Sequence, residues 1–374
     1  MATARNSSMT QDSCLVLGLE SSCDETAASV LRRHADGKVE LLSNIVASQD
    51  EEHRPFGGVV PEIAARAHMR KLDPIINLAI ERSGVDWEDL DGIAATAGPG
   101  LIGGVITGLL GAKGLSLALN KPLIAVNHLE GHALSPRLTE PCPFPYLLLL
   151  VSGGHSQLLC VKGLGDYERL GSTVDDAAGE AFDKSAKVMG LGFPGGPQVQ
   201  AWAEKGDPKS VPLPRPMKGR DHADFSFAGL KTAVARAWEA SDKSDKAKAD
   251  LSASFQRAIT ETMIDRVGNA MTRYRNITNE DGQARLVVAG GVAANSELRA
   301  ALKQIAEKRA FDFIAPPLKF CGDNAAMIAL AGAERLTKGM IDGPDAPARP
   351  RWPLDQEAAS IAPKSGFGKR GPKS

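Results

Sequence analysis

The chain has 374 residues and a formal net charge of −1, with 43% hydrophobic and 24% charged residues. This composition is typical of a soluble globular protein, and it excludes a chain whose overall charge attracts nucleic acid. A chain of this length is too long for one core, so two domains are expected. No run of about 18 consecutive apolar residues occurs, and we therefore expect no membrane span.

The five cysteines lie far apart in the sequence and form no C-x-x-C pair. An odd and scattered set argues against a disulfide framework and against a zinc site made of cysteines. The N-terminus also lacks the apolar core of a secretory signal. Both features favour a reducing compartment, and a cytoplasmic protein is expected.

Two segments share one design, in which an apolar run passes through a polar or glycine turn into a second strand-like run. They are residues 14–31 and 146–161. The pattern predicts two β-hairpins. Because the apolar runs are continuous, their strands are expected to be buried on both faces, as in a layered α/β fold. The two similar hairpins suggest an internal duplication, with one copy in each domain.

Three further segments, 91–119, 121–138 and 284–302, each predict a strand followed by a helix. The expected organisation consists of a disordered leader (1–13), an N-terminal domain (14–125), a C-terminal domain with the ligand sites (126–340), an extension (341–352) and a basic flexible tail (353–374).

Another predicted helix begins with Ser172 or Thr173 as its N-cap and ends at Gly190 or Gly192. The carboxylates of Asp175, Asp176 and Glu180 near its beginning suit the helix dipole. Asp183 lies in the middle of this helix, where the dipole favours it little. A structural role and the binding of ribose hydroxyls both remain open for this residue.

Glycine-rich or polar turns follow several of the apolar runs. Those at 20–26, 151–155 and 289–295 lie where strands are expected to end, which is where α/β folds bind ligands. Glycine lets backbone N–H groups approach an anion without a Cβ atom in the way. The convergence favours nucleotide binding, although no turn matches the P-loop or the full dinucleotide-binding motif.

His128 and His132 lie four residues apart in a predicted helix, so their side chains share one face and could bind one metal ion. Asp323, at the start of another apolar helix, is the candidate third ligand, and an N-cap role would explain it equally well. In zinc peptidases the catalytic glutamate directly follows the first histidine. Here Glu130 lies roughly 200° around the helix from His128, so a peptidase is disfavoured and Glu130 has no assigned role.

A series of long motifs carries a resemblance to one family. They are GLESSCDET, GGVVPEIAARAH, TAGPGLIGG, HLEGH, LLVSGGHSQL, DDAAGEAFDK, GFPGGP, FSFAGLKT, AGGVAAN and CGDNAAMIA. Over about residues 14–352 the chain resembles the bacterial tRNA N6-adenosine threonylcarbamoyltransferases, once labelled O-sialoglycoprotein endopeptidases. The resemblance implies an α/β fold of the duplicated actin/sugar-kinase/Hsp70-like (ribonuclease H-like) type with two domains.

The resemblance implies transfer of threonylcarbamoyl from threonylcarbamoyl-AMP to N6 of adenosine 37 in tRNAs that read codons beginning with adenine. An ATPase or sugar-kinase-like phosphotransferase is the alternative, and a metallopeptidase is a weaker one. A paralogous pseudo-enzyme subunit and a small ATPase subunit are the implied partners, besides tRNA.

The implied cofactor is one divalent metal ion per subunit, Fe²⁺ with Zn²⁺ or Mg²⁺ as alternatives, bound by His128, His132 and Asp323. Glu25 matches an acidic residue that the family needs for activity. The implied adenylate site comprises Leu150, Val151, Ser152, Gly153, Gly154, Asp183, Gly196 and Asn295.

Overall fold

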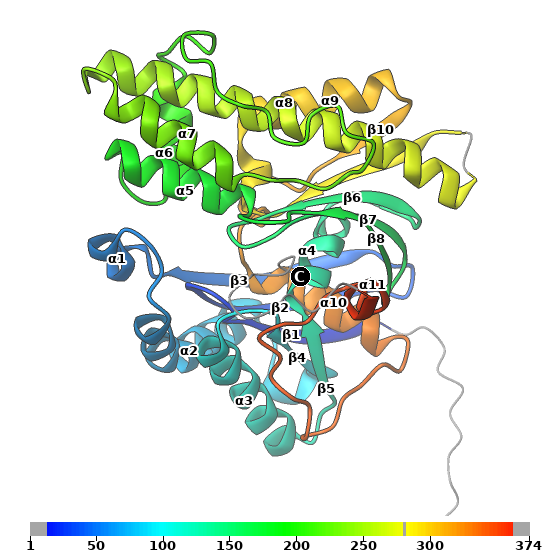
Figure 1. Ribbon diagram of the computed structural model, residues 1–374. Coiled ribbons are helices and arrows are strands. Elements are labelled where there is room, and N and C mark those ends of the chain that lie inside the picture. Colours follow the sequence, from blue (N-terminus) through cyan, green and yellow to red (C-terminus); the bar gives the residue numbers. More distant parts are fainter. Residues whose placement is uncertain (1–12, 280–281, 362–374) are drawn as a thin grey trace, which may run out of the picture.

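The computed structural model describes residues 13–279 and 282–361 (Figure 1). The chain forms two lobes, and each is built on one five-stranded sheet. The predicted leader up to residue 12 and the last part of the predicted tail lie outside the described residues.

The first sheet has the strand order β3-β2-β1-β4-β5. Its strands are β1 (Cys14–Glu20), β2 (Glu25–Arg33), β3 (Val39–Ser48), β4 (Gly92–Gly98) and β5 (Leu123–Asn127). The β1–β2 and β2–β3 pairs are antiparallel, whereas β4 pairs in parallel with both β1 and β5. Strands β1, β4 and β5 are buried along their whole length, which explains their continuous apolar sequences.

The second sheet has the order β10-β9-β6-β7-β8. Its strands are β6 (Tyr146–Val151), β7 (Ser156–Gly163), β8 (Asp166–Ser172), β9 (Ala284–Ala289) and β10 (Phe311–Ile314). Strands β6, β7 and β8 form antiparallel pairs, and β6–β9 and β9–β10 are parallel. Order and direction repeat those of the first sheet, so the predicted duplication, both hairpins and the actin/sugar-kinase/Hsp70-like α/β fold are confirmed.

Three helices belong to the first lobe. They are α1 (Asp50–His53), α2 (Pro61–Ser83) and α3 (Ile102–Leu119). Helix α2 packs on β2 and β3, and α3 packs on α2 and β4 (Figure 1). By length and composition alone, α3 could cross a membrane, and it is the one such helix among the described residues.

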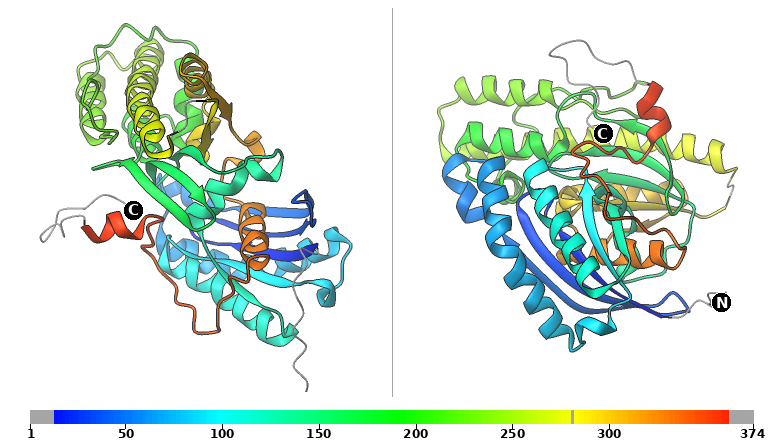
Figure 2. Two further views of the ribbon diagram at one scale, coloured as in Figure 1. Left: turned by 90° about the vertical axis from the view of Figure 1, so that its right-hand side faces the viewer. Right: turned by 90° about the horizontal axis from the view of Figure 1, so that it is seen from below.

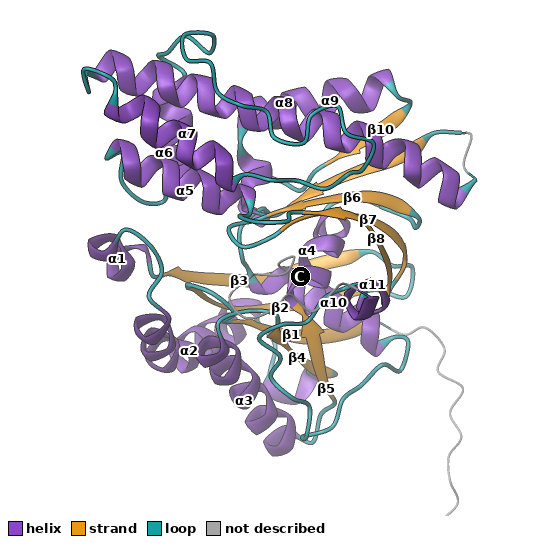
Figure 3. Cartoon of the chain, in the orientation of Figure 1, coloured by secondary structure: helices purple, strands orange, loops and turns teal. Residues whose placement is uncertain are grey.

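Five helices cover the outer face of the second sheet (Figure 3). They are α5 (Ala178–Met189), α6 (Gly195–Ala203), α7 (Ala228–Glu239), α8 (Asp245–Thr278) and α9 (Ser296–Lys308). Short 3-10 turns occur at Arg54–Phe56, Trp87–Asp89, Ser135–Leu138, Gly291–Ala294 and Leu318–Phe320. One large apolar core joins these helices to the sheet, with Leu149, Phe182 and Phe255 among its buried members.

Two helices lie between the sheets, α4 (His128–Leu134) and α10 (Ala325–Leu336) (Figure 1). Each follows the fifth strand of its copy, since α4 comes after β5 and α10 after β10. Leu129 and Ala133 of α4 pack in one core with side chains of the second sheet. Helix α10 packs on β1, β2 and β4 instead, so a late part of the chain completes the first lobe.

The C-terminal segment runs back along the first lobe and then reaches the second (Figure 2). The backbone N–H of Asp342 donates to Leu123 O at 2.8 Å, and that of Arg349 donates to Ala97 O at 2.7 Å. Asp355 accepts from the backbone N–H of Arg169 in β8 at 2.8 Å. Helix α11 (Gln356–Ile361) follows, inside the segment predicted to be a flexible tail.

The predicted start of α5 is wrong. Ser172 still pairs with Gln157 in the sheet, and Thr173 donates its hydroxyl to Asp176 O, so the helix begins only at Ala178. Gly190 ends the helix as predicted, in the left-handed conformation with φ 68°.

Candidate functional site

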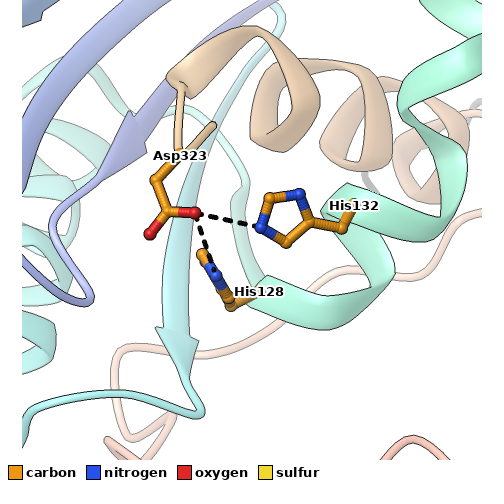
Figure 4. A group of neighbouring side chains, drawn as sticks. All are labelled: His128, His132 and Asp323. Atoms are coloured by element: carbon orange, nitrogen blue, oxygen red, sulfur yellow. Dashed lines mark hydrogen bonds and ion pairs between the residues drawn. The ribbon is translucent and has the colours of Figure 1, made fainter. Parts of the chain in front are cut away.

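The three predicted metal ligands converge between the lobes (Figure 4). Their ligand atoms all lie within 4.8 Å of one another. Asp323 Oδ1 is 3.0 Å from His132 Nε2 and 3.5 Å from His128 Nε2. His132 is completely buried and His128 is 5% exposed, so the structure holds both rings in place. This geometry supports one ion bound by two imidazoles and one carboxylate.

Asparagine caps set the position of both helices that lead to these ligands. Asn127 Oδ1 accepts from Leu129 N at the start of α4, which places His128 at the first helical position. At α10 the N-cap is Asn324, whose Oδ1 accepts from Met327 N. The alternative N-cap role for Asp323 is therefore wrong, and its carboxylate is available to a ligand.

Glu20 at the end of β1 is a site residue that sequence reasoning missed. Its fully buried carboxylate lies 2.9 Å from His128 Nδ1 and accepts from the Thr96 hydroxyl at 2.6 Å. Holding Nδ1 leaves Nε2 of His128 as the free ligand atom. A glutamate that ends an otherwise apolar strand was the available signal.

The electrostatics of the triad favour a positive charge. Burial acts to lower the pKa of His128, but the carboxylates of Asp323 and Glu20 outweigh it and raise the pKa to about 9. Burial acts to raise the pKa of Asp323, but His128 and His132 hold it well below its usual range. The same carboxylates that retain a proton on His128 would attract a metal cation.

The glycine turn between β6 and β7 is open. A Cβ atom added to Gly153 or Gly154 would meet nothing within 4 Å among the described residues. The turn rests on α5, where the backbone N–H groups of Gly179 and Glu180 donate to Ser152 O and Gly153 O. Room for a ligand and a fixed backbone are what an anion-binding turn needs.

Other residues of the predicted adenylate site lie around this turn. Leu150 and Val151 are completely buried, so only their backbone could contact a ligand. Asp183 Oδ1 accepts from Gly195 N at 2.8 Å and so fixes the beginning of α6, beside the open Gly196. The structure therefore supplies the structural role that the sequence left open for Asp183.

Asn295 is nearly buried, at 8% exposed, and its side chain has structural partners of its own. Its Oδ1 caps α9 by accepting from Leu298 N, and its Nδ2 donates to Gln256 at 2.7 Å. The 3-10 turn before Asn295 contacts both β6 and α5. This turn thus joins the glycine turn and α5 on one side of the site.

The metal ligands and the glycine turn belong to one site. His155, at the end of the turn, acts electrostatically on Asp323 and lowers its pKa. Burial raises the pKa of Asp183, and Asp24 in the β1–β2 turn raises it further. The β1–β2 turn and the glycine turn thus each lie close enough to residues of the other lobe for their charges to interact.

Glu25 is the first residue of β2, directly after the β1–β2 turn. Burial, with the nearby carboxylates of Asp323 and Asp24, raises the pKa of Glu25 well above its usual value. His68 from α2 supports the turn, since one of its ring nitrogens lies 3.1 Å from Cys23 O and the other 2.8 Å from the Thr26 hydroxyl. A carboxyl group with a raised pKa close to other ionisable side chains is typical of proton-transfer sites.

Glu130 faces away from the metal ligands, as the sequence predicted. It is 1% exposed, pairs with Arg335 and accepts from the hydroxyl of Tyr167. With these partners the carboxylate is not available to activate a water molecule. The structure thus gives a second argument against a peptidase.

A family model described as tRNA N6-adenosine threonylcarbamoyltransferase matches residues 40–330. A protein of that name from Maricaulis maris is 59% identical over 360 residues, which cover 96% of both chains. The one from Caulobacter vibrioides is 57% identical and covers 97% of this chain and 98% of its own.

Among solved structures, T. kodakarensis HypF matches with a TM-score of 0.58 at 16% identity. The match covers 88% of this chain and 48% of HypF, and it supports the fold alone. The family match extends over most of the chain and includes all three metal-ligand positions. The chain therefore belongs to the tRNA N6-adenosine threonylcarbamoyltransferase family.

Proposed function

We propose that this chain transfers threonylcarbamoyl from threonylcarbamoyl-AMP to N6 of adenosine 37, in tRNAs that read codons beginning with adenine. The family name supports an acyltransferase acting on tRNA adenosine. The observation that carries the proposal is that the open glycine turn follows β6, which packs with the histidine helix α4, and that His155 of this turn acts electrostatically on Asp323. The arrangement suits an activated acyl-adenylate, whose two halves need different partners.

The residues of the triad fit one divalent metal ion. Two imidazoles and one carboxylate are a ligand set typical of Fe²⁺ or Zn²⁺, whereas Mg²⁺ prefers oxygen ligands. We therefore propose Fe²⁺, with Zn²⁺ as the first alternative and Mg²⁺ as the second. When bound, the ion would supply Lewis-acid polarisation of the carbamoyl oxygens.

The residues of the chain would bind the adenylate part of the substrate and accept the proton. Backbone N–H groups of Gly153 and Gly154 would hold the phosphate of AMP, because that of Ser152 already donates to His155 O, and Asp183 and Asn295 would border the nucleoside. A bond forms between N6 of adenine and the carbamoyl carbon, and the bond from that carbon to the phosphate oxygen breaks. Glu25 is the proposed proton acceptor, because burial and the nearby carboxylates raise the pKa of its carboxyl group and so make the carboxylate a stronger base.

Transfer to tRNA also implies partners and a place in the cell. We propose a cytoplasmic assembly with a paralogous pseudo-enzyme subunit and a small ATPase. The apolar face of α3 is the proposed contact with the paralogue, since Ile106, Leu110 and Leu117 lie on one helix face and are 41%, 59% and 66% exposed. A partner built on the same fold would have a helix equivalent to α3, and the two equivalent helices could pack against each other.

The contact is tested by Leu110→Lys, with Leu318→Lys as a control at an equally exposed leucine in the second lobe. Only Leu110→Lys is expected to abolish the heterodimer in size-exclusion chromatography. Equal association of both variants with the paralogue would refute this contact surface.

The main experiment measures threonylcarbamoyladenosine by mass spectrometry in unmodified tRNA incubated with threonylcarbamoyl-AMP, this chain and its partners. The double variant His128→Ala, His132→Ala is expected to lose the modification by about 10³-fold or more, since metal polarisation contributes several kcal/mol. Full activity of the double variant would contradict the role of the triad. Hydrolysis of ATP by the chain alone, without tRNA modification, would favour a phosphotransferase instead.

A further inference from the structure

Glu130 lies between the two histidines of the HLEGH motif, yet it touches neither the metal ligands nor the glycine turn. Its Oε2 accepts from the Tyr167 hydroxyl at 2.8 Å and from Arg335 Nη2 at 3.2 Å, and its Oε1 pairs with Arg335 Nε. The Glu130 side chain is 1% exposed and that of Arg335 is 15% exposed. A buried carboxylate is costly unless it is paired, so this arrangement calls for an explanation.

A second ion pair lies next to the first, and in it α10 supplies the acidic residue rather than the basic one. Glu334 of α10 accepts from Arg137 Nε at 2.8 Å, and Arg137 lies in the 3-10 turn that continues α4. Glu334 and Arg335, consecutive residues of α10, thus pair with a basic and an acidic residue of the segment formed by α4 and the turn after it. Two such contacts oppose both sliding and rotation of α4 along α10.

The two helices also approach closely at Gly131, the residue after Glu130. A Cβ atom added to Gly131 would come within 2.8 Å of Ile328 Cδ1 in α10. The second lobe holds α4 from the other side, because the Tyr146 hydroxyl donates to Ala133 O at 2.9 Å. Tyr167, in β8, joins Glu130 to the same lobe.

The metal ligands depend on this alignment, because they come from both helices. His128 and His132 belong to α4, whereas Asp323 lies just before α10. The 3.0 Å and 3.5 Å distances from Asp323 to the two imidazoles therefore change with any shift of one helix along the other.

We infer that Glu130 is a positioning residue, which with Arg335 locks α4 against α10 so that both histidines and Asp323 reach one metal ion. The inference rests on the metal site of the proposed function, and it adds a residue that acts through the ligands. It explains why the glutamate lies inside the histidine motif although it faces away from the metal.

The test measures binding of Co²⁺ to the metal-free full chain by calorimetry and by the visible absorption of the bound ion. Glu130→Gln leaves all three ligands in place but removes the charge that pairs with Arg335. We expect about tenfold weaker Co²⁺ binding and an altered spectrum, as for other residues that orient metal ligands. Tyr167→Phe, which removes one hydroxyl, is expected to weaken binding by about twofold to threefold.

Glu261→Gln is the matched control. Glu261 of α8 also accepts from arginines, Arg215 and Arg257, but it has no contact with α4 or α10 among those that the structure describes. This variant is expected to lower the melting temperature and to leave Co²⁺ affinity and spectrum unchanged.

Two outcomes separate this inference from the metal site itself. If Glu130→Gln melts earlier but binds Co²⁺ with the affinity and spectrum of the wild type, Glu130 has only a structural role and the inference is wrong. If the wild type binds no Co²⁺, or binds it equally well after His128→Ala with His132→Ala, the metal site and this inference both fail. Should Glu130→Gln not fold, the comparison of Tyr167→Phe with the wild type decides.

Discussion

The first turns of the two sheets occupy the same place in the duplicated fold but have opposite chemistry. In the β1–β2 turn, Glu20 and Glu25 flank buried serines and an aspartate, and the turn packs against α2 and α3. In the β6–β7 turn, Gly153 and Gly154 leave open space. At the strand end, Glu20 of the first copy corresponds to Val151 of the second. We propose that the acidic turn supports a histidine that binds a cation and that the glycine turn offers N–H groups to an anion.

The fourth strands of the two sheets show what the copies have kept. A glycine with positive φ lies at the end of β4 and directly after the end of β9, with φ 135° at Gly98 and 94° at Gly290. A Cβ atom at Gly290 would overlap Val151 O, and one at Gly98 would overlap Arg349 O of the C-terminal segment. The backbone geometry is thus shared, whereas the neighbour that requires glycine differs.

The largest expected effect comes from breaking this shared geometry. Gly290→Ala forces a side chain into a left-handed conformation and against the Val151 carbonyl, so it should lower the free energy of unfolding by about 3 kcal/mol or more. Denaturant unfolding followed by circular dichroism measures the change. Gly291→Ala is the control, since its Cβ meets nothing within 4 Å among the described residues and should cost about 1 kcal/mol or less. Equal costs for both variants would refute the close contact.

The second largest effect is expected in the acidic β1–β2 turn. Glu20→Gln removes the charge beside His128 Nδ1, and we expect metal affinity to fall by about tenfold to 100-fold. Calorimetric titration with Zn²⁺ or Co²⁺ measures it. Ser22→Ala, which removes a hydroxyl 3.1 Å from the same nitrogen, should have a smaller effect. Unchanged affinity in Glu20→Gln would show that the carboxylate serves the fold rather than the metal.

The glycine turn is expected to affect the binding of the acyl-adenylate, with no change in stability. Gly153→Ala has room in the protein, but its methyl group would point into the space proposed for the phosphate, so the KM for threonylcarbamoyl-AMP should rise about tenfold. Steady-state kinetics of tRNA modification measures it. Gly163→Ala, an equally open position at the other end of β7, should change neither KM nor the melting temperature. A normal KM in Gly153→Ala would place the phosphate elsewhere.

The sequence was sufficient for features that depend on neighbouring residues. Apolar runs predicted both hairpins, and the spacing of His128 and His132 predicted one shared helix face. Asp323 was a candidate third ligand from its place before an apolar helix, and the resemblance favoured that role over an N-cap; the structure brings it within 3.0 Å of His132 although 191 positions separate them. These predictions succeed because strand and helix periodicity are local properties.

Contacts between distant segments could not be predicted in this way. Asp175 was expected to favour the start of α5, yet its carboxylate accepts from Phe227 N and Ala228 N and caps α7 instead. The carboxylates of Glu20 and Glu130 find their partners only when strands and helices from both copies come together. A local pattern shows that a polar group is buried, but the fold decides which group satisfies it.

The smallest expected effect concerns the asparagine caps of α4 and α10, the helices that come after the fifth strand in each copy. Asn127 caps α4 and its Nδ2 also donates to Trp352 O at 2.9 Å, whereas Asn324 caps α10 and its Nδ2 donates to Gly322 O nearby. Alanine at either position should cost about 1 kcal/mol of stability through loss of the cap. Asn127→Ser keeps a cap but loses the donor to the C-terminal segment, so the serine variant measures that bond alone. If it is as unstable as Asn127→Ala in thermal unfolding, the C-terminal segment rather than the cap holds the beginning of the histidine helix in place.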